Sequence, residues 1–270
     1  MSNVSFYFPF GEKLHPVIQE DKSHKKAFVL GVYASAVHAR WKKDGRVICP
    51  ALAVASEPRI FWDGDLAEAK GIIEKIHLPS GCGTLEPSDS RFNGPSSKVL
   101  AKNILAPLGL SRKDVWLCDL LPEARLNDSQ IKRIQKSYEP LRAQYGLNEV
   151  TIPPRPGDGE DSFCNVERAQ KVTEELLASK ADLLILLGDI PFKQYLIKVG
   201  KNFSLCNSLD EYVRQYGYGH VSQVVIAGKC FSLLPLAHPR QIGGLGSHNP
   251  KWRKFHAVWE KEIAGQRRYD

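Results

Sequence analysis

The sequence lacks an apolar run long enough to cross a bilayer. Its most hydrophobic stretch, LLILL at 183–187, ends at Gly188-Asp189, well short of the roughly 18–20 residues that a transmembrane helix needs. The N-terminus has no basic start, no long apolar stretch and no small-residue cleavage site, so nothing in it directs export. We therefore expect a cytoplasmic protein without a membrane partner.

The six cysteines lack the close spacing of a CxxC or CxxxC pair. This spacing argues against a zinc ribbon and against a secreted disulfide scaffold, and indicates reduced thiols. We expect no metal site and no cofactor. Internal repeats and low-complexity segments are also lacking, and the 270 residues have an ordinary globular composition, 43% hydrophobic and 25% charged. Wholesale disorder and fibrous structure are therefore excluded.

Positive charge is concentrated in two blocks within a chain of net charge +7. Residues 22–46 contain seven Lys or Arg against one Asp, and residues 238–270 contain seven against three acidic residues. Two basic blocks from opposite ends of the chain could converge on one phosphate-binding face. The alternative is a solvated surface that only aids solubility.

Short apolar runs alternate with amphipathic segments, a pattern that predicts an α/β fold. We expect a three-layer αβα sandwich with a central, mostly parallel, four-stranded sheet, in a single domain spanning residues 1–270. Pro50 indicates that the extended segment 46–55 lies at a sheet edge or a bulge. Strands are expected at 27–33, 115–122, 183–187 and, as a hairpin, 223–237. Helices are expected at 65–76, 95–109, 165–182, 191–199 and 249–263, with a long loop at 151–162.

Unusual residues stand where three of the expected strands end. They are the segment Gly31–Ser35, Asp119 and His238. In open α/β sheets, ligands bind beyond the carboxyl ends of the strands. The Tyr in the first segment could instead serve packing, and Asp119 could be a helix cap. The glycine-rich sequence 243–246 after His238 indicates a loop that approaches a ligand closely.

The order of four segments resembles that of the uracil-DNA glycosylase superfamily, over nearly the whole chain from Val29 to Ile263. LGVYAS at 30–35 resembles the first motif of that superfamily, and RFNGPSS at 91–97 begins a block that resembles its aromatic motif. The segment 167–196 is similar to its helix–strand–Gly–helix unit, and 233–263 to its His-Pro-Ser motif and final helix. The likeness is closest to the branch that can carry an iron–sulfur cluster. The chain has no N-terminal cysteine pair, and Arg168 stands near the expected helix ligand, so we expect no cluster.

The resemblance implies a DNA glycosylase that flips a nucleotide out of DNA and hydrolyses its N-glycosidic bond. Phe92 would stack on the flipped base, Asp119 would bind the pyrimidine edge, and His238 would stabilise charge on base O2. The implied substrate-binding residues also include Gly31, Tyr33, Ser35 and Asn93. The implied DNA-binding residues are Ser96, Ser97, Arg240, Gln241, Leu245, His248, Lys251 and Arg253. The expected partner is double-stranded or single-stranded DNA, bound by a monomer.

The first motif departs from the family pattern. Tyr33 and Ala34 replace its Asp or Asn and its Pro, so the usual water-activating carboxylate is absent. His38, Asp63 and Asp119 are the candidate substitutes. The connection at 36–86 is also longer than usual in the family.

An Asp at position 119, where the family has Asn, favours cytosine-type bases, because an ionised carboxylate can only accept hydrogen bonds. We expect a 5-modified cytosine, such as glucosylated hydroxymethylcytosine of phage DNA, and a role in antiviral defence. The enlarged connection could house the 5-substituent. Otherwise the target would be uracil in base-excision repair. Two other classes stay open: a non-catalytic nucleic-acid-binding or sensing protein, and a nucleotide- or nucleoside-processing enzyme on a similar sheet.

Overall fold

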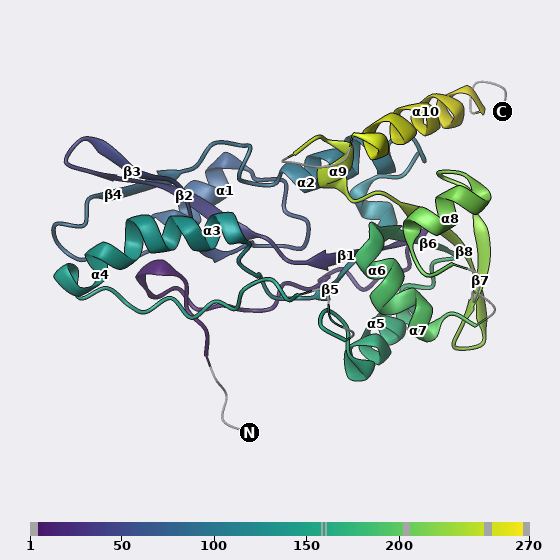
Figure 1. The fold of residues 1–270 in the computed structure, drawn as a ribbon, viewed down its shortest axis with the longest axis horizontal. Coiled ribbons are helices and arrows are strands. Elements are labelled where there is room, and N and C mark those ends of the chain that lie inside the picture. Colours follow the sequence, from purple (N-terminus) through teal and green to yellow (C-terminus); the bar gives the residue numbers. More distant parts are fainter. Residues whose placement is uncertain (1–4, 158, 160, 202–205, 246–249, 267–270) are drawn as a thin grey trace. The chain divides into compact units, whose positions relative to one another are not determined.

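A computed structural model describes residues 5–157, 159, 161–201, 206–245 and 250–266. The chain divides into two compact units, and the elements of both are labelled in Figure 1. Unit 1 consists of Met1–Val17, Tyr33–Pro95 and Pro122–Gly157. Unit 2 consists of Ile18–Val32, Ser96–Leu121 and Asp158–Asp270.

The main sheet, in unit 2, has five strands in the order β5-β1-β6-β8-β7. β1 and β6 pair in parallel, as do β6 and β8, whereas β7 is antiparallel to β8. The predicted α/β class and the mostly parallel sheet are confirmed. The predicted number of four strands is wrong, because the hairpin at its edge adds β7 as a fifth. The strands are β1 (Ala27–Tyr33), β5 (Val115–Leu121), β6 (Leu183–Leu187), β7 (Ser222–Ile226) and β8 (Lys229–Leu236).

The runs AFVLGVY of β1, VWLCDLL of β5 and LLILL of β6 are almost entirely buried. Continuous apolar runs of this kind suit strands that are covered on both faces, which is the situation in parallel sheets. Helix α5 (Val166–Ser179) contributes to that cover, since Ala169, Val172 and Leu176 are buried. Its N-cap is Asn165, whose side chain accepts the Arg168 N–H, a bond that satisfies a helix donor.

The other helices of unit 2 are short, except for the last. Helix α2 continues directly into a π-helical segment, Leu100–Leu105, and a second π-helical segment spans Phe192–Leu196. No helix in the described ranges is both long and apolar enough to span a membrane. The remaining helices are α2 (Pro95–Val99), α6 (Asp189–Pro191), α7 (Ile197–Val199), α8 (Leu209–Tyr216), α9 (Pro239–Ile242) and α10 (Lys251–Gln266).

Unit 1 contains a second sheet that the sequence did not reveal as one. Its three strands have the order β3-β2-β4 and are antiparallel: β2 (Ala36–Lys43), β3 (Arg46–Ser56) and β4 (Thr84–Pro87). The enlarged connection 36–86 therefore contains the strands of this sheet and helix α1 (Leu66–Ile73). Asp44-Gly45 makes the two-residue turn between β2 and β3, the kind of turn that Asp-Gly favours.

The predicted position of Pro50 is confirmed. β3 is an edge strand, and its pairing with β2 passes from Trp41–Cys49 to Ala39–Leu52. Pro50 lies in the resulting bulge, where its missing N–H leaves no gap in a central ladder.

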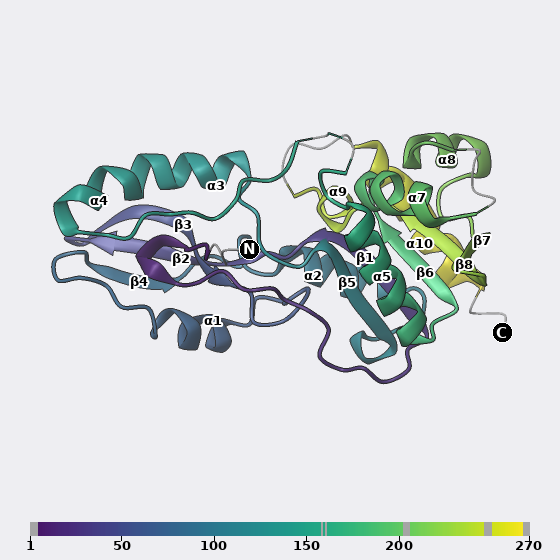
Figure 2. The same ribbon diagram turned by 90° about the horizontal axis from the view of Figure 1, so that it is seen from below.

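Aromatic side chains form the core of unit 1. Phe10 packs edge-on against Trp41 and Tyr138, with ring centroids 5.3 and 5.2 Å apart, a favourable arrangement for aromatic pairs. The Trp41 indole N–H donates to the Cys82 carbonyl at 2.6 Å, so its polar atom is satisfied. Figure 2 shows α3 and α4 on one face of this sheet and α1 on the other. The helices are α1 (Leu66–Ile73), α3 (Asp128–Arg133) and α4 (Glu139–Tyr145), with a π-helical segment Ile134–Tyr138 between the last two.

Two lysines at the amino edge of the main sheet, Lys25 and Lys26, are held by acidic partners. The Lys25 side chain is only 3% exposed, and its ammonium group donates to the Asp21 carboxylate and, at 3.0 Å, to the Lys113 carbonyl. Lys26 pairs with Asp114 at 2.8 Å. Both lysines precede β1, whereas His238 follows β8, and parallel strands put these positions at opposite edges of the sheet. This part of the first basic block therefore does not converge with the second.

These ion pairs predict a pH-dependent stability. Hydrogen bonds from Lys25 and Lys26 hold the pKa values of Asp21 and Asp114 below their usual range. A carboxyl whose folded pKa is lowered stabilises the fold above its unfolded pKa of about 3.9, and that contribution disappears as the pH falls toward the folded value. We expect Asp21→Asn/Asp114→Asn to lower the urea midpoint at pH 6, with the difference from wild type shrinking below about pH 4.

Asp44→Asn is the control, because it changes a carboxylate on the exposed hairpin turn. Its urea midpoint should stay close to that of wild type. A difference between wild type and the double variant that is constant from pH 2 to 7 would contradict the assignment.

Candidate functional site

The carboxyl edge of the main sheet brings His238 next to the end of β6. The Gly188 N–H donates to the Leu236 carbonyl at 2.7 Å, so the two strand ends stay paired. Gly188 has φ +92°, and a Cβ built there would lie 3.1 Å from the His238 Cβ. A side chain at 188 would crowd the imidazole, so the glycine lets the chain approach His238 closely.

His238 is the N-cap of α9. Its Nδ1 accepts the Arg240 N–H at 3.2 Å, and its own N–H donates to Gln241 Oε1 at 3.1 Å. A ring nitrogen that accepts a hydrogen bond carries no proton, so the neutral ring has its proton on Nε2. The half-buried imidazole therefore has a hydrogen-bond donor at Nε2.

The half-buried Tyr218 and the buried His256, a pair that sequence reasoning missed, support the turn before His238. The Ala237 N–H donates to the Tyr218 hydroxyl at 3.1 Å, and that hydroxyl lies 2.7 Å from His256 Nδ1. His256 Nε2 lies 2.9 Å from the Asn103 carbonyl, so Nε2–H donates there and Nδ1 accepts from Tyr218. Burial lowers the pKa of His256, which keeps this ring neutral and its two bonds fixed.

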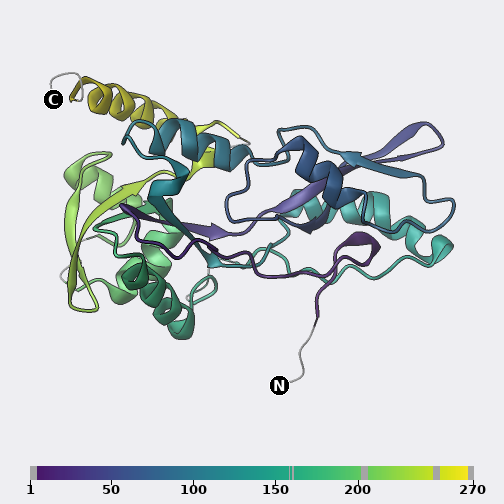
Figure 3. The same cartoon turned by 180° about the vertical axis from the view of Figure 1, so that it is seen from behind.

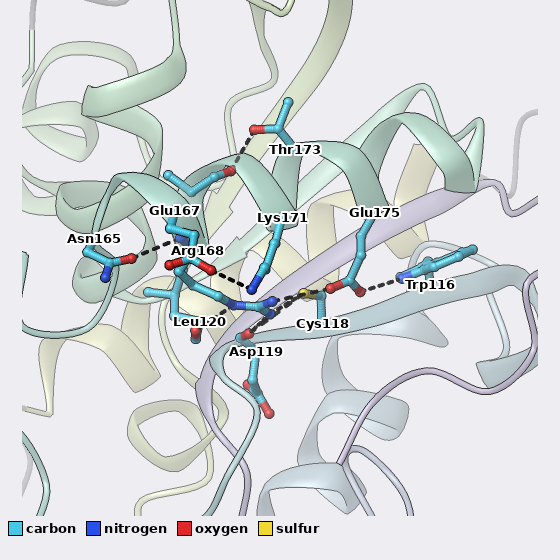
Figure 4. A network of polar contacts seen from close by, with 11 residues as sticks. Trp116, Cys118, Asp119, Leu120, Asn165, Glu167, Arg168, Lys171, Thr173 and Glu175 are labelled. Atoms are coloured by element: carbon cyan, nitrogen blue, oxygen red, sulfur yellow. Dashed lines mark hydrogen bonds and ion pairs between the residues drawn. The ribbon is translucent and has the colours of Figure 1, made fainter. Parts of the chain in front are cut away.

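Arg168 clamps the end of β5 at Asp119 (Figure 4). Its guanidinium donates to the Asp119 carbonyl at 2.6 Å and to the Leu120 carbonyl at 2.8 Å. It also lies 3.4 Å from both Cys118 Sγ and Glu175 Oε1. The Asp119 carboxylate points away from the guanidinium in Figure 4, and the residue is only 4% exposed.

The same contacts define the surroundings of the cysteines. Burial raises the pKa of Cys118 well above its usual value, so this thiol stays protonated. All six cysteines lie in the described part of the chain as free thiols. Among the described residues, no three His, Cys, Asp or Glu side chains cluster as metal ligands.

His38 lies in unit 1, on β2, and is tied by neighbouring amides. The Asn93 side chain accepts the His38 N–H at 2.8 Å and donates to its carbonyl at 3.0 Å. Gln130 Nε2 lies 2.8 Å from His38 Nε2. Asn93 is buried, so its amide serves chiefly to fix β2.

Phe92 is half-buried beside His38, with ring centroids 6.4 Å apart. The guanidinium of Arg133 lies 4.9 Å from the Phe92 ring centroid, and that of Arg91 lies 5.9 Å away. Cation–π contacts of this kind hold the ring in place. The predicted stacking residue is thus an aromatic ring flanked by positive charge.

Asp63 forms an ion pair with Arg59 at 2.9 Å, and its side chain is 56% exposed. The buried carboxylate in this part of unit 1 is instead Glu57, which is 3% exposed. Its oxygens accept the Ser35 N–H at 3.1 Å and the Trp62 N–H at 3.3 Å. Glu57 therefore ties the first-motif segment to the loop that precedes Asp63, and no sequence pattern pointed to it.

Two glycine loops of unit 1 cross with their main chains in contact. A Cβ at Gly94 would lie 2.0 Å from the Asp63 carbonyl carbon, and a Cβ at Gly64 would lie 2.2 Å from the Asn93 oxygen. Both glycines have positive φ. The crossing fixes Asp63 and Phe92 as parts of one assembly.

The predicted DNA-binding residues differ in their exposure and engagement. Ser97 is buried and Ser96 half-buried in α2, whereas Arg240 and Arg253 are exposed. Gln241 is engaged by His238, and Lys251 by the Asp210 carboxylate. The half-buried Leu245 donates its N–H to the Arg240 carbonyl at 2.8 Å. His248 lies outside the described residues.

The structure thus assembles the predicted residues in two groups. Unit 2 contains Gly31 on β1, beside the β6 end through the Leu30–Leu186 pairing, with Asp119 and His238 at the same sheet edge. Unit 1 contains the other group: the half-buried Tyr33 at the end of β1, the exposed Ser35, His38, Asp63, Phe92 and Asn93.

The chain matches no protein-family model and no curated protein.

Because the two glycine loops cross in contact, the addition of one methyl group at Gly94 should lower the free energy of unfolding. Gly94→Ala places a Cβ against the Asp63 main chain, in addition to the strain of a left-handed alanine, about 1–2 kcal/mol. We expect a further loss of about 1–3 kcal/mol in the free energy of unfolding. Gly146→Ala is the matched control in the same unit, because Gly146 has φ +62° with nothing within 4 Å of its Cβ. Equal losses in urea denaturation would show that the crossing is not tight.

Proposed function

We propose that the protein is a DNA glycosylase of the uracil-DNA glycosylase superfamily, which hydrolyses the N-glycosidic bond of a modified or damaged pyrimidine. The observation that carries the proposal is the geometry of His238. Its capping bond at Nδ1 places the ring proton on Nε2, at the same sheet edge as the buried carboxylate of Asp119.

The fold supports this assignment. The finer architecture that we propose is a three-layer αβα sandwich around the five-stranded sheet β5-β1-β6-β8-β7. Helix α5 packs on β5 through the bond from the Trp116 indole to Glu175, and α10 packs on the helix after α2 through Asn103. Function still has to come from the site, because one fold serves many activities.

Cleavage of the bond between C1′ and the base leaves positive charge on the sugar and negative charge on the base. His238 Nε2–H would donate to O2 of the departing base, where that charge collects. Water then attacks C1′, and its proton passes to one of the candidate bases His38, Asp63 and Asp119. Asp63 is already paired with Arg59, which leaves Asp119 as the buried carboxylate at the edge with His238.

We propose selection of the base as the alternative role of Asp119, because cytosine N4 lies across the ring from C1′ and one carboxylate cannot serve both positions. An ionised carboxylate accepts the cytosine N4 amino group, whereas it would meet uracil O4 as a second acceptor. Removal of ordinary cytosine would destroy the host genome, so a 5-substituent has to mark the target. Glucosylated hydroxymethylcytosine of phage DNA fits this requirement and gives the enzyme an antiviral role. Uracil in base-excision repair is the other substrate of this reaction class. The proposed enzyme is a cytoplasmic monomer that acts on double- or single-stranded DNA.

A second function is favoured by one specific feature. Tyr33 and Ala34 remove the family's water-activating carboxylate and proline from the first motif, as expected of a non-catalytic nucleic-acid-binding or sensing protein. A gel assay for abasic sites on modified duplex DNA separates the two, because only a glycosylase forms them.

His238→Asn tests the catalytic role without removing the helix cap. Asn is a good N-cap, so its side chain can accept the Arg240 N–H, but it has no group in place of Nε2–H. We expect the single-turnover rate to fall on the order of 10²–10³-fold, as for loss of one oxyanion donor, with the melting temperature and duplex affinity close to wild type. If His238→Asn keeps the rate and His238→Ala only lowers the melting temperature, the histidine is structural.

Asp119→Asn tests the selection of the base. The amide can donate to O4 and should shift the ratio of uracil release to modified-cytosine release toward uracil, roughly tenfold for about 1–3 kcal/mol of unmatched polar contact. The measurement is mass spectrometry of bases released from DNAs that contain uracil, hydroxymethylcytosine or glucosylated hydroxymethylcytosine. An unchanged ratio would show that Asp119 does not contact the base edge.

A further inference from the structure

Helix α10 has one positively charged side. Trp252, His256 and Trp259 are buried and mark the side that faces the core. At about 100° per residue, the exposed side chains at 253, 254 and 261 fall within one arc of about 100°. Phe255 and Glu262 lie on the other side of the helix. The sequence therefore concentrates Arg253, Lys254 and Lys261 along one flank of α10.

That flank borders the side of α10 that contacts the helix formed by residues 95–105. His256 Nε2 bonds the Asn103 carbonyl at 2.9 Å, and the Asn103 amide donates to Glu260 at 2.8 Å. Figure 3 shows α10 lying along this helix from behind. Lys98 and Lys102 are exposed on it and lie four residues apart, so they share a face.

The charged surface continues to the helix of His238. A Cβ at Gly243 would lie 2.7 Å from Val99, and one at Gly244 would lie 3.5 Å from the Arg253 guanidinium. The end of α9 thus lies against both α2 and α10. Arg240 is exposed on α9. We call these six side chains the basic stripe: Lys98, Lys102, Arg240, Arg253, Lys254 and Lys261.

The basic stripe is not neutralised by neighbours. Within the part of the chain that the structure describes, none of its six members has a carboxylate within 4.0 Å. By contrast, Lys251 pairs with Asp210, and Lys25 and Lys26 at the amino edge pair with Asp21 and Asp114. Six cations of unit 2 without a carboxylate partner among the described residues are thus gathered beside α9.

We propose that the basic stripe binds the phosphate backbone of the DNA duplex that flanks the flipped nucleotide. The proposal rests on the proposed function, since it gives the stripe a place next to His238. From Arg253 to Lys261 the axis of α10 rises about 12 Å, which matches three to four phosphates at about 3.4 Å per strand. Exposed lysines on adjoining helices suit a repeating polyanion, for which point charges are sufficient.

The test measures the affinity for a fluorescent 24-base-pair unmodified duplex between 50 and 300 mM NaCl. Two double variants remove stripe charges away from His238: Lys98→Gln/Lys102→Gln and Lys254→Gln/Lys261→Gln. Each should reduce the slope of log affinity against log salt by up to about 1.8, since each phosphate contact contributes about 0.9. The control is Lys113→Gln/Lys180→Gln, which removes two exposed charges at the amino edge and should leave the slope unchanged.

Two results would overturn the proposal: slopes that stay at the wild-type value in both stripe variants, or equal losses in the control. The proposal would also be overturned if the wild type does not bind the duplex, or if the stripe variants lose binding to phosphatidylserine vesicles but keep binding to the duplex. Base release by the wild type is scored separately. Reduced slopes without base release from any DNA would support the stripe and reject the glycosylase. Base release with unchanged slopes would reject the stripe alone.

Discussion

Parallel pairing of β1, β6 and β8 is the constraint on which the main unit depends. Strands that are buried on both faces cannot carry polar side chains along their length, so polar groups appear where the strands end. Asp119 and His238 stand at those ends. The chain then needs further bonds to hold each end still. Arg168 does so for β5, and the Tyr218–His256 pair does so for the turn after β8.

Much of the fold can be predicted because its signals are local. The apolar runs of β1, β5 and β6 and the amphipathic pattern of α5 lie in single short windows, and each expected element forms. The sheet of unit 1 could not be predicted from local sequence patterns. β4 is only four residues long, TLEP, without an apolar pattern, and its pairing with β2 is non-local. Helix α10 forms as expected, but its exposed side includes the apolar Phe255, which is 41% exposed, while the polar His256 is buried.

The site divides in the same way. Strand ends can be found from sequence, so His238 and Asp119 could be named. Their supports could not, because Arg168 meets the Asp119 carbonyl across 49 positions and His256 meets Asn103 across 153. Asn93 was expected at the substrate, yet its amide holds β2. A polar residue in a motif can serve the backbone, and only the partners distinguish the two roles.

Positive charges without acidic partners are distributed unevenly over the described part of unit 2. At the amino edge Lys25 and Lys26 each have a negative neighbour, and such pairs have little field beyond the Debye length of about 8 Å at physiological ionic strength. The six cations of the basic stripe have no carboxylate within 4.0 Å among the described residues. Their field therefore extends over about one Debye length. A polyanion would therefore exert a torque on this unit before any contact forms. Collisions would then begin with His238 already turned toward the strand, which raises the fraction of encounters that lead to a complex.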